Sequence, residues 1–409
     1  MKLLINLMPY AVFFLELDTR RKSHYALETS WKGKFLFDII EMFTTDYSEI
    51  IDKIESIDPI EYSRTRNYLS GAVTYLSPYI ARGVVSTKLV MLSLISRGFK
   101  LYEIESMIKE LAWRDYFQRV HQSLGSEIYT DIKNQQSDVI SNKIPTCIIN
   151  GNTGIEGIDH SINTLYTTGY VHNHFRMYTA MLATNIAQTH WSECSKWYYC
   201  HLLDADIASN TLSWQWVCGA FSHKKYYANQ ENINKYFGKN QSNTFLDTSY
   251  EILAEMSAPN IFHDRIEDLN LATNLPSNTE LKIDYRLPTL IYNFYNLDPI
   301  WHENLKANRI LLLEPSTFEK HPISQKSIDF MLALANNISD VQIFVGEFSE
   351  LKQHIENSEI YFKEHPLNYN YSGIEESRDW MCTEVTSYFP SFFSYWKKIE
   401  PILKSQFRS

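Results

Sequence analysis

The chain has 409 residues, 44% of them hydrophobic and 14% aromatic, which is enough for two domains with buried cores. Its formal net charge of −10 argues against a general polyanion-binding protein. The charge is uneven, because residues 61–240 hold 17 Lys and Arg against 14 Asp and Glu and so carry +3, which leaves −13 on the rest. That central part is therefore compatible with contact to nucleic acid.

Residues 1–44 match no pattern that we can name. The opening stretch, MKLLINLMPYAVFFLEL, mimics the core of a short signal peptide. It contains Pro9, lacks a small-residue cleavage site and is too short to span a bilayer. We therefore expect a segment without a targeting role and a protein without membrane spans.

From residue 45 to about residue 240 the apolar residues recur every three to four positions, which predicts a mainly helical domain. Gly98 follows one of these runs, at a place where a residue able to turn left-handed ends a helix. A polar stretch, residues 130–153, is long enough to be a surface excursion. The helical pattern is clearest at residues 48–57, 87–98, 102–124, 157–169 and 174–191.

After a polar linker at residues 241–284 the pattern changes to short apolar runs of strand length. Helix-like segments at 324–338 and 350–357 lie between them, which is typical of a small parallel α/β sheet. We therefore expect a mainly α protein, in which a helical domain at 45–240 precedes an α/β domain at 285–409. The strand-like runs occupy residues 287–295, 309–315, 341–348 and 360–365.

Candidate functional residues are most concentrated between residues 168 and 216. Asp204 and Asp206 stand in apolar surroundings, where a carboxylate needs a cation or a hydrogen-bond donor, and Arg176 is the nearest candidate. Asn210 lies four residues before a tryptophan and so shares one helix face with it. A paired guanidinium, an amide and stacked aromatics suit a planar heterocycle with polar edges, such as a flavin. A helical core with internal salt bridges explains the same residues equally well.

The order of these residues resembles the photolyase/cryptochrome family over residues 45–240. The stretches TGYVHNHFRM, HW and WYYCHLLDADIASNTLSWQW look like its flavin-binding signature. YSRTRNYLSGAVTYLSPYIARGVVS resembles its flavin diphosphate loop, and ELAWRDYFQRV resembles the helix that faces both flavin and substrate. TGIEGIDHSINTLYTTGYVHN resembles the segment that leads to the substrate cleft. The resemblance implies an all-helical FAD-binding domain, while any antenna pigment is not identified.

The resemblance assigns roles around the flavin ring. Arg176 should pair with Asp204, and Asp206 should bond the pyrimidine edge. Asn210 should lie beside N5, where an amide accepts a hydrogen bond from protonated N5 or donates one to unprotonated N5. The implied FAD contacts are Tyr62, Thr74, Tyr75, Leu76, Ser77, Met107, Glu110, Arg114, Asn173, Arg176, Asp204, Asp206 and Asn210.

The diphosphate would lie at a helix start, because no G-x-G-x-x-G or P-loop occurs in the chain. Thr74, Leu76 and Ser77 precede Pro78 and offer hydroxyl and backbone N–H donors where the helix dipole favours anions. A plain Ser/Pro helix start, without a ligand, is the alternative.

The resemblance also implies a substrate pocket. An aromatic side chain can stack on a flipped-out pyrimidine, and a carboxylic acid can hydrogen-bond its carbonyl edge. The alternative is that the tryptophans are core and the glutamate is a solvated helix residue. The residues that match this pocket in photolyases acting on cyclobutane dimers are Glu110, Trp113, Asn173, Met177 and Trp216.

Two of these positions bear on the substrate. Relatives that repair the 6-4 photoproduct carry His where this chain has Asn173 and Met177. His172 and His174 flank the site without filling those positions, and Tyr170 replaces a more usual Trp. The resemblance therefore implies cyclobutane dimers as the substrate.

Trp214 and Trp191 match the first two members of the electron-relay tryptophans of the family. The third usually sits in a loop that corresponds to residues 122–152, which contain no Trp. Either a tyrosine completes the route or photoreduction is inefficient. The tyrosines considered are Tyr129, Tyr198 and Tyr199, whereas Trp197 is better read as core.

Five cysteines show no CxxC pair and no zinc spacing, so we expect no metal and mostly buried thiols. Reduced thiols point to the cytoplasm. Some bacterial relatives carry a four-Cys iron–sulfur cluster, and nothing here matches such a pattern. The cysteines are Cys147, Cys194, Cys200, Cys218 and Cys382.

In typical photolyases an α/β domain precedes the helical one, whereas here it follows. It is either a permuted counterpart of the antenna domain or an unrelated docking domain. The resemblance favours light-driven repair of cyclobutane dimers in DNA, with single strands preferred because residues 61–240 carry only +3. A cryptochrome-like photoreceptor is the alternative, favoured by the acidic charge, the missing third Trp and the relocated domain. A nonphotochemical flavoprotein has no positive feature.

Overall fold

The computed structural model describes residues 43–355 and 358–407. Residues 1–42 lie outside them, so the reading of the opening stretch as non-targeting remains a prediction. From Thr44 onward the chain forms one compact unit. None of the helices in the described ranges combines the length and the hydropathy that a membrane span needs.

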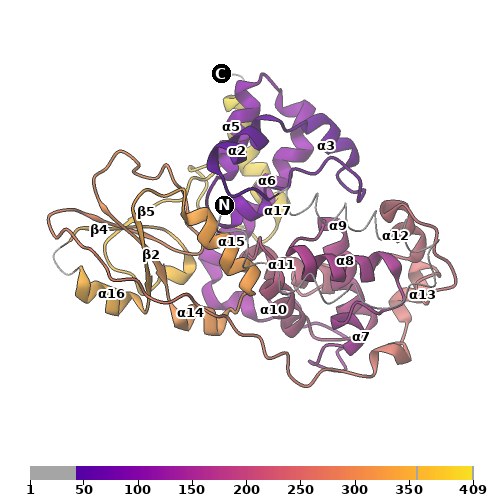
Figure 1. Ribbon diagram of the computed structural model, residues 1–409. Helices are drawn as coiled ribbons and strands as arrows, with labels where there is room; N and C mark the ends of the chain where they lie inside the picture. The colour runs from indigo at the N-terminus through magenta and orange to yellow at the C-terminus, as the bar shows by residue number, and fades with distance from the viewer. Residues whose placement is uncertain (1–42, 356–357, 408–409) are drawn as a thin grey trace, which may run out of the picture. The chain divides into compact units, whose positions relative to one another are not determined.

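The first part of this unit is helical, as the periodicity predicts (Figure 1). The run at 87–98 forms α5, and Gly98 follows its end with a φ of 84°. The helices of this part are α2 (Tyr47–Glu55), α3 (Pro59–Thr65), α4 (Ser77–Ala81), α5 (Thr87–Ser96), α6 (Leu101–Leu124), α7 (Thr146–Ile149), α8 (Glu156–Thr168), α9 (Asn173–Met181), α10 (Trp191–His201), α11 (Ile207–Cys218), α12 (Gln230–Phe237) and α13 (Tyr250–Glu255).

The run at residues 174–191, expected as one helix, is broken. After α9 the chain forms a π-helical turn, η2 (Leu182–Ile186), and α10 begins only at Trp191. Gln188 has a φ of 54°, which an α-helix does not accommodate, and His190 then caps α10 by accepting a hydrogen bond from Ser192 N. The spacing of apolar residues in the sequence does not predict this break.

The last part contains a five-stranded sheet in the order β3-β2-β1-β4-β5, with every neighbouring pair parallel. The four predicted strands are confirmed. The fifth, β5, was not predicted because its sequence, IEE, is short and mostly charged. The strands are β1 (Thr289–Tyr292), β2 (Asn308–Leu313), β3 (Val341–Val345), β4 (Ile360–Lys363) and β5 (Ile374–Glu376), and the helices are α14 (Pro315–Lys320), α15 (Gln325–Ala335), α16 (Phe348–His354) and α17 (Phe392–Gln406).

The order in which strands are added to the sheet reverses at β1, although all strands are parallel. From β1 the chain runs outward to β2 and β3, then returns to place β4 on the other side of β1. β2 is buried along its whole length, as expected of a parallel strand covered on both faces. In such sheets the crevice at the carboxyl ends of the two strands at the reversal is where ligands bind.

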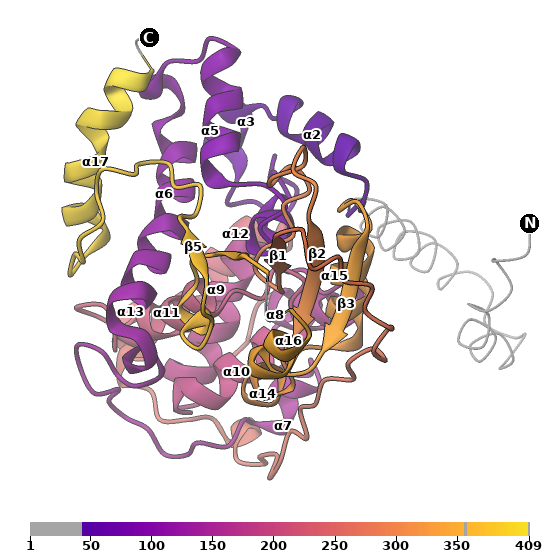
Figure 2. The same ribbon diagram turned by 90° about the vertical axis from the view of Figure 1, so that its left-hand side faces the viewer.

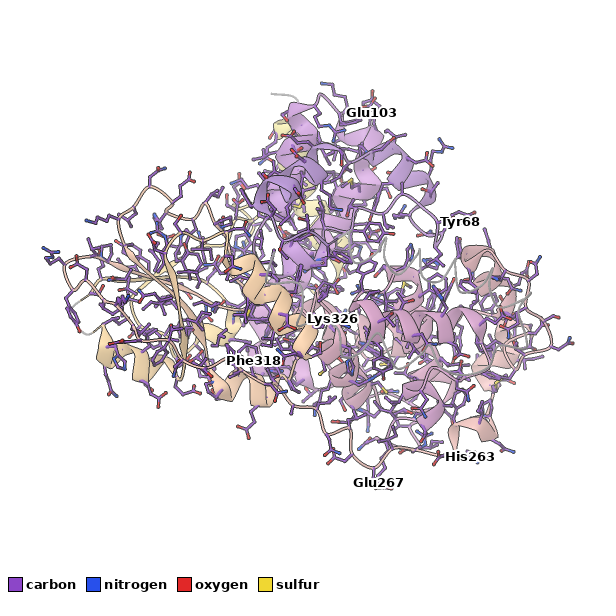
Figure 3. The ribbon with its side chains drawn as sticks, in the orientation of Figure 1. Tyr68, Glu103, His263, Glu267, Phe318 and Lys326 are labelled. Carbon is purple, nitrogen blue, oxygen red and sulfur yellow. The ribbon has the colours of Figure 1, made fainter. Side chains whose placement is uncertain are left out.

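Specific contacts join the two parts of the compact unit. Lys326, at the start of α15 (Figure 3), donates to the carbonyl oxygens of Tyr166 and Thr167 at 3.1 and 2.9 Å. At the other end of the chain, α17 lies beside α6 (Figure 2). Phe392 of α17 stacks on Trp113 of α6 with ring centroids 3.9 Å apart and planes 11° apart.

Asp115 on α6 gives a pH-dependent prediction. It is buried, accepts hydrogen bonds from Thr87 Oγ1 and Met381 N, and burial raises its pKa to about 6 despite these donors. An unfolded Asp titrates near pH ~4. The folded state therefore binds more protons between about pH 4 and 6, and this carboxyl makes stability fall as pH rises through that window.

Asp115→Asn should remove that contribution. The free energy of unfolding of the variant, relative to the wild type, should rise by up to about 3 kcal/mol between pH 4 and 6. Urea unfolding at each pH measures it, with Asp52→Asn on the exposed side of α2 as the control. A difference that stays constant over this pH range would contradict the prediction.

Candidate functional site

The ion pair expected between Arg176 and Asp204 is present, with Nη2 and Oδ2 2.9 Å apart. Arg176 is held on α9 by a hydrogen bond from Nε to the carbonyl oxygen of Val171 at 2.7 Å. Burial raises the pKa of Asp204, but the Arg176 guanidinium, a hydrogen bond with Ser77 and the charge of Arg114 together outweigh burial, so the pKa lies below its ordinary value. Oδ1 of this buried carboxylate has no hydrogen-bond partner among the described residues. Such an oxygen is suited to accept a hydrogen bond from a bound molecule.

Asp206, two residues further on, is committed to the protein. Its Oδ1 accepts from Ser209 N at 2.7 Å and so caps α11, and its Oδ2 accepts from Gln118 Nε2 at 2.5 Å. Both oxygens already have donors. The capacity to bond a flavin edge is therefore greater at Asp204 than at Asp206, to which the resemblance assigned it.

Asn210, one turn into α11, has a fixed orientation. Its Nδ2 donates to the carbonyl oxygen and to Oγ of Ser195 at 2.9 and 2.8 Å. A carbonyl oxygen only accepts, so the amide nitrogen must face Ser195. In the described part of the chain nothing donates to Asn210 Oδ1, which leaves the acceptor role for a ligand.

The predicted helix start at the diphosphate loop is present, because α4 begins at Ser77. Tyr75, just before it, has a φ of 54°, so the loop turns through a left-handed residue. Arg114 on α6 makes no hydrogen bond or ion pair with the described residues. Its positive charge acts on Asp204 and Asp206 without a direct hydrogen bond, so its N–H groups are available to a phosphate oxygen. Together with the unpartnered Asp204 oxygen, Arg114 fits the FAD that the sequence implies.

Several side chains implied for the substrate pocket remain accessible to solvent. Glu110 on α6 has 41% of its side chain exposed and lies 3.6 Å from Arg66 Nη2. Trp216 on α11 is 36% exposed, whereas Trp214 on the same helix is 3% exposed. Trp216 is therefore not a core residue, which was the alternative. Of the others, Asn173 is exposed and Trp113 and Met177 are half-buried.

One face of Trp113 is covered by Phe392, as described above. A base could therefore stack only on the opposite face. Met107, one of the implied FAD contacts, is 2% exposed on α6, and Tyr62 on α3 is half-buried beside Arg66.

The aromatic rings around Trp214 distinguish the three tyrosines considered as the third relay residue. Its ring centroid lies 5.7 Å from that of Tyr198 in an edge-to-face contact. Tyr199 hydrogen-bonds Tyr295 instead, and Tyr129 hydrogen-bonds His321. Among the three tyrosines considered, Tyr198 is thus the one in contact with Trp214, which the resemblance implies as the first relay tryptophan. Trp191 is buried with its indole N–H on Asp131 Oδ1 at 2.6 Å, and Trp197 is buried with its own on Tyr166 Oη at 2.9 Å.

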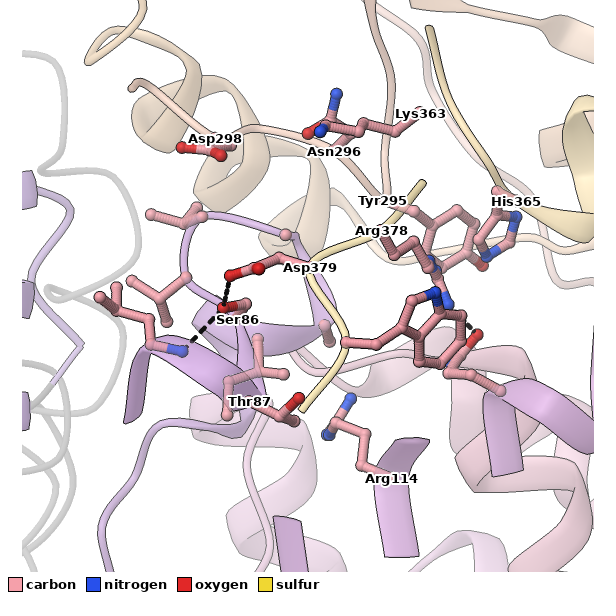
Figure 4. Close-up of a pocket in the computed structure, with 18 of the residues that line it drawn as sticks. Ser86, Thr87, Arg114, Tyr295, Asn296, Asp298, Lys363, His365, Arg378 and Asp379 are labelled. Atoms are coloured by element: carbon pink, nitrogen blue, oxygen red, sulfur yellow. Dashed lines mark hydrogen bonds between the residues drawn. The ribbon is translucent and has the colours of Figure 1, made fainter. Parts of the chain in front are cut away.

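A cavity of about 170 Å³ lies at the reversal of the sheet (Figure 4). Tyr295, after β1, stacks on His365, after β4, with ring centroids 4.2 Å apart. Arg114 and Asp206 line the cavity from the helical part. We missed the sheet side of this cavity in the sequence, although polar residues at or just beyond the carboxyl ends of predicted strands were a usable signal. Those residues are Asn293, Asn296, Lys363 and Asn368.

Comparison with known proteins identifies the class of this helical site. A sequence profile described as the FAD binding domain of DNA photolyase matches residues 107–290. The deoxyribodipyrimidine photo-lyase of Alkalihalophilus pseudofirmus is 31% identical over 166 residues, which cover 38% of this chain and 33% of that protein. Cryptochrome DASH of Natronomonas pharaonis is 25% identical over 245 residues, 56% of this chain and 50% of that one. The match to residues 107–290 supports the photolyase/cryptochrome family that the sequence motifs indicate.

The similarity covers only part of each relative's length. The matched region spans about a third of the length of the first curated relatives, from 28% to 40%. A solved structure of a bacterial class III photolyase from Agrobacterium tumefaciens overlaps 57% of this chain and 55% of its own, at 20% identity and a TM-score of 0.43.

Proposed function

We propose that this protein binds one FAD noncovalently and uses light to split cyclobutane pyrimidine dimers in DNA. The observation that carries the proposal is the accessibility of Trp216 and Glu110, in a helical part where Trp191, Trp197 and Trp214 are 1–3% exposed. A large aromatic and a carboxylate left accessible suit a base that enters from solvent.

Three groups would hold the cofactor. Asp204 Oδ1 would accept a hydrogen bond from the ring edge, with Arg176 keeping that carboxylate ionised. Arg114 would bind the diphosphate. Asn210 Oδ1 would accept from N5 when N5 is protonated, which favours the reduced states. When bound, FAD supplies light-driven electron donation to the dimer.

The substrate would be held by side chains of α6 and α9 and by Trp216 of α11. Trp113 would stack on a flipped-out base with the face opposite Phe392, and Glu110 would hydrogen-bond the pyrimidine carbonyl edge. Asn173 and Met177, in place of a His pair, favour cyclobutane dimers over 6-4 photoproducts. Single-stranded DNA would be preferred, since a net charge of +3 over residues 61–240 offers few phosphate contacts.

A repair assay tests the proposal. Purified protein with fully reduced flavin is mixed with a dimer-containing oligonucleotide and illuminated with blue light, with a dark sample and a 6-4 substrate as controls. We expect loss of the cyclobutane dimer in the light only. Protein that holds FAD but neither prefers damaged DNA nor repairs it would leave the photoreceptor as the function.

Glu110→Gln should lower the repair yield more than the affinity for damaged DNA. The amide keeps the size of the side chain but loses the acid that would stabilise charge on the reacting pyrimidine. Binding and repair are measured on the same oligonucleotide, with Glu103→Gln on the same helix as the control. Equal losses in both quantities would assign Glu110 to binding alone.

The second candidate function is a cryptochrome-like photoreceptor. The net charge of −10 and the absence of Trp from residues 122–152 favour it. For either function we propose the cytoplasm as the compartment, because all five cysteines are free thiols.

A further inference from the structure

Arg378 lies after β5 in the last part of the chain, yet its guanidinium reaches α6 of the helical part. Its Nη1 donates to Gln118 Oε1 at 2.5 Å, and Gln118 Nε2 donates to Asp206 Oδ2 at 2.5 Å. Figure 4 shows Arg378 beside the Tyr295–His365 stack at the cavity. Gln118 and Asp206 are 6% and 3% exposed. Two consecutive hydrogen bonds thus connect the α/β part to the cap of α11.

The direction of these bonds is determined by the chemistry of the two ends. A guanidinium only donates and an ionised carboxylate only accepts, so the amide between them has one orientation that satisfies both. Without Arg378, Gln118 Oε1 would lose its donor. The amide could then turn its oxygen towards Asp206, which would set two acceptors against each other.

Arg378 is itself held in place. Its backbone N–H donates to Glu364 Oε1 at 2.9 Å, and the same oxygen accepts from Trp380 Nε1 at 2.5 Å. The other oxygen of Glu364 accepts from Gln122 Nε2 at 3.1 Å. A side chain anchored through such a network loses little freedom when it orients a neighbour.

We propose that Arg378 is a positioning residue of the flavin site, acting through Gln118 on Asp206. Asp206 caps α11, and α11 carries Asn210 and Trp214. The α/β part of the chain thereby completes a site that otherwise belongs to the helical part. This inference rests on the proposed function, since it assumes that α11 contacts FAD.

The charges around Asp206 give the proposal a pH signature. Burial raises the pKa of Asp206, and Arg114 and Arg378 are among the groups that bring it below its ordinary value. Arg82 and His121 also face this carboxylate, as do the phenols of Tyr199 and Tyr295. Removal of Arg378 leaves Arg114 as the main counter-charge of Asp206, so the Asp206 carboxylate should become protonated at a higher pH than in the wild type. Protonated Asp206 is a weaker acceptor, so the cap of α11 should weaken at that higher pH.

Arg378→Met tests this directly, because methionine keeps the length of the side chain without a donor. FAD is titrated into the apoprotein and the dissociation constant is measured from flavin fluorescence. We expect a value about ten- to a hundred-fold higher than in the wild type, as for loss of a hydrogen bond to a charged group. FAD release on acidification should begin at a higher pH. Arg286→Met, on an 87% exposed side chain of the same part, is the matched control.

A double-mutant cycle separates positioning from general loss of structure. At a pH well above the pKa of Asp206, the carboxylate is ionised in every variant and the charge of Arg378 no longer changes its protonation. If Arg378 acts through Gln118, then Arg378→Met should cause no further loss of FAD affinity there in a Gln118→Leu background. Arg378→Lys should recover part of the affinity. Additive losses, or an Arg378→Met variant with the FAD affinity and pH profile of the control, would overturn the proposal. Wild-type protein that binds no FAD would instead overturn the proposed function.

Discussion

Arg176→Ala is expected to abolish FAD retention and to destabilise the protein. Asp204 has 2% of its side chain exposed and Arg176 is its ion-pair partner at 2.9 Å. Without the guanidinium a buried carboxylate is left unpaired, at a cost of about 3–5 kcal/mol. Urea unfolding of the apoprotein measures this cost, and the flavin content of the purified protein measures retention.

Two variants make this result interpretable. Arg64→Ala removes a surface arginine, 72% exposed and 3.1 Å from Glu61, and should change neither quantity. Arg176→Lys keeps the charge but loses the hydrogen bond from Nε to Val171, so it should retain part of the flavin. An Arg176→Ala protein that purifies with one FAD per chain would rule out the proposed placement of the ring.

Trp214→Phe is expected to block photoreduction of bound FAD. Trp214 is 3% exposed on α11, the helix that also carries Asn210. The family resemblance implies that Trp214 is the first electron-relay residue, and phenylalanine is much harder to oxidise. The measurement is the flavin absorbance under blue light with an external thiol reductant, compared with the same protein in the dark.

The neighbours of Trp214 predict the rest of the route. Trp191→Phe should slow photoreduction, and Tyr198→Phe tests the ring that lies 5.7 Å from Trp214. Trp197→Phe is the comparison, since we read Trp197 as core. Unchanged photoreduction in Trp214→Phe would mean that electrons enter by another path.

The sequence by itself determined most of the local structure. Apolar spacing placed α5, α6 and α8, and short apolar runs placed four of the five strands. The order of the motifs also predicted the ion pair between Arg176 and Asp204, which the structure contains. The helices and strands depend on residues close together in the chain, so the linear pattern is sufficient to predict them. The ion pair joins separate elements, and it was predicted from the family resemblance.

The tertiary structure alone decided the contacts between distant segments. Arg378 and Gln118 are 260 residues apart, and no local pattern pairs them. The same holds for Phe392 on Trp113 and for the cavity at the reversal of the sheet. β5 exists because it pairs with β4, although two of its three residues are charged. Such contacts are selected by the packing of whole elements, which the order of residues within one element does not encode.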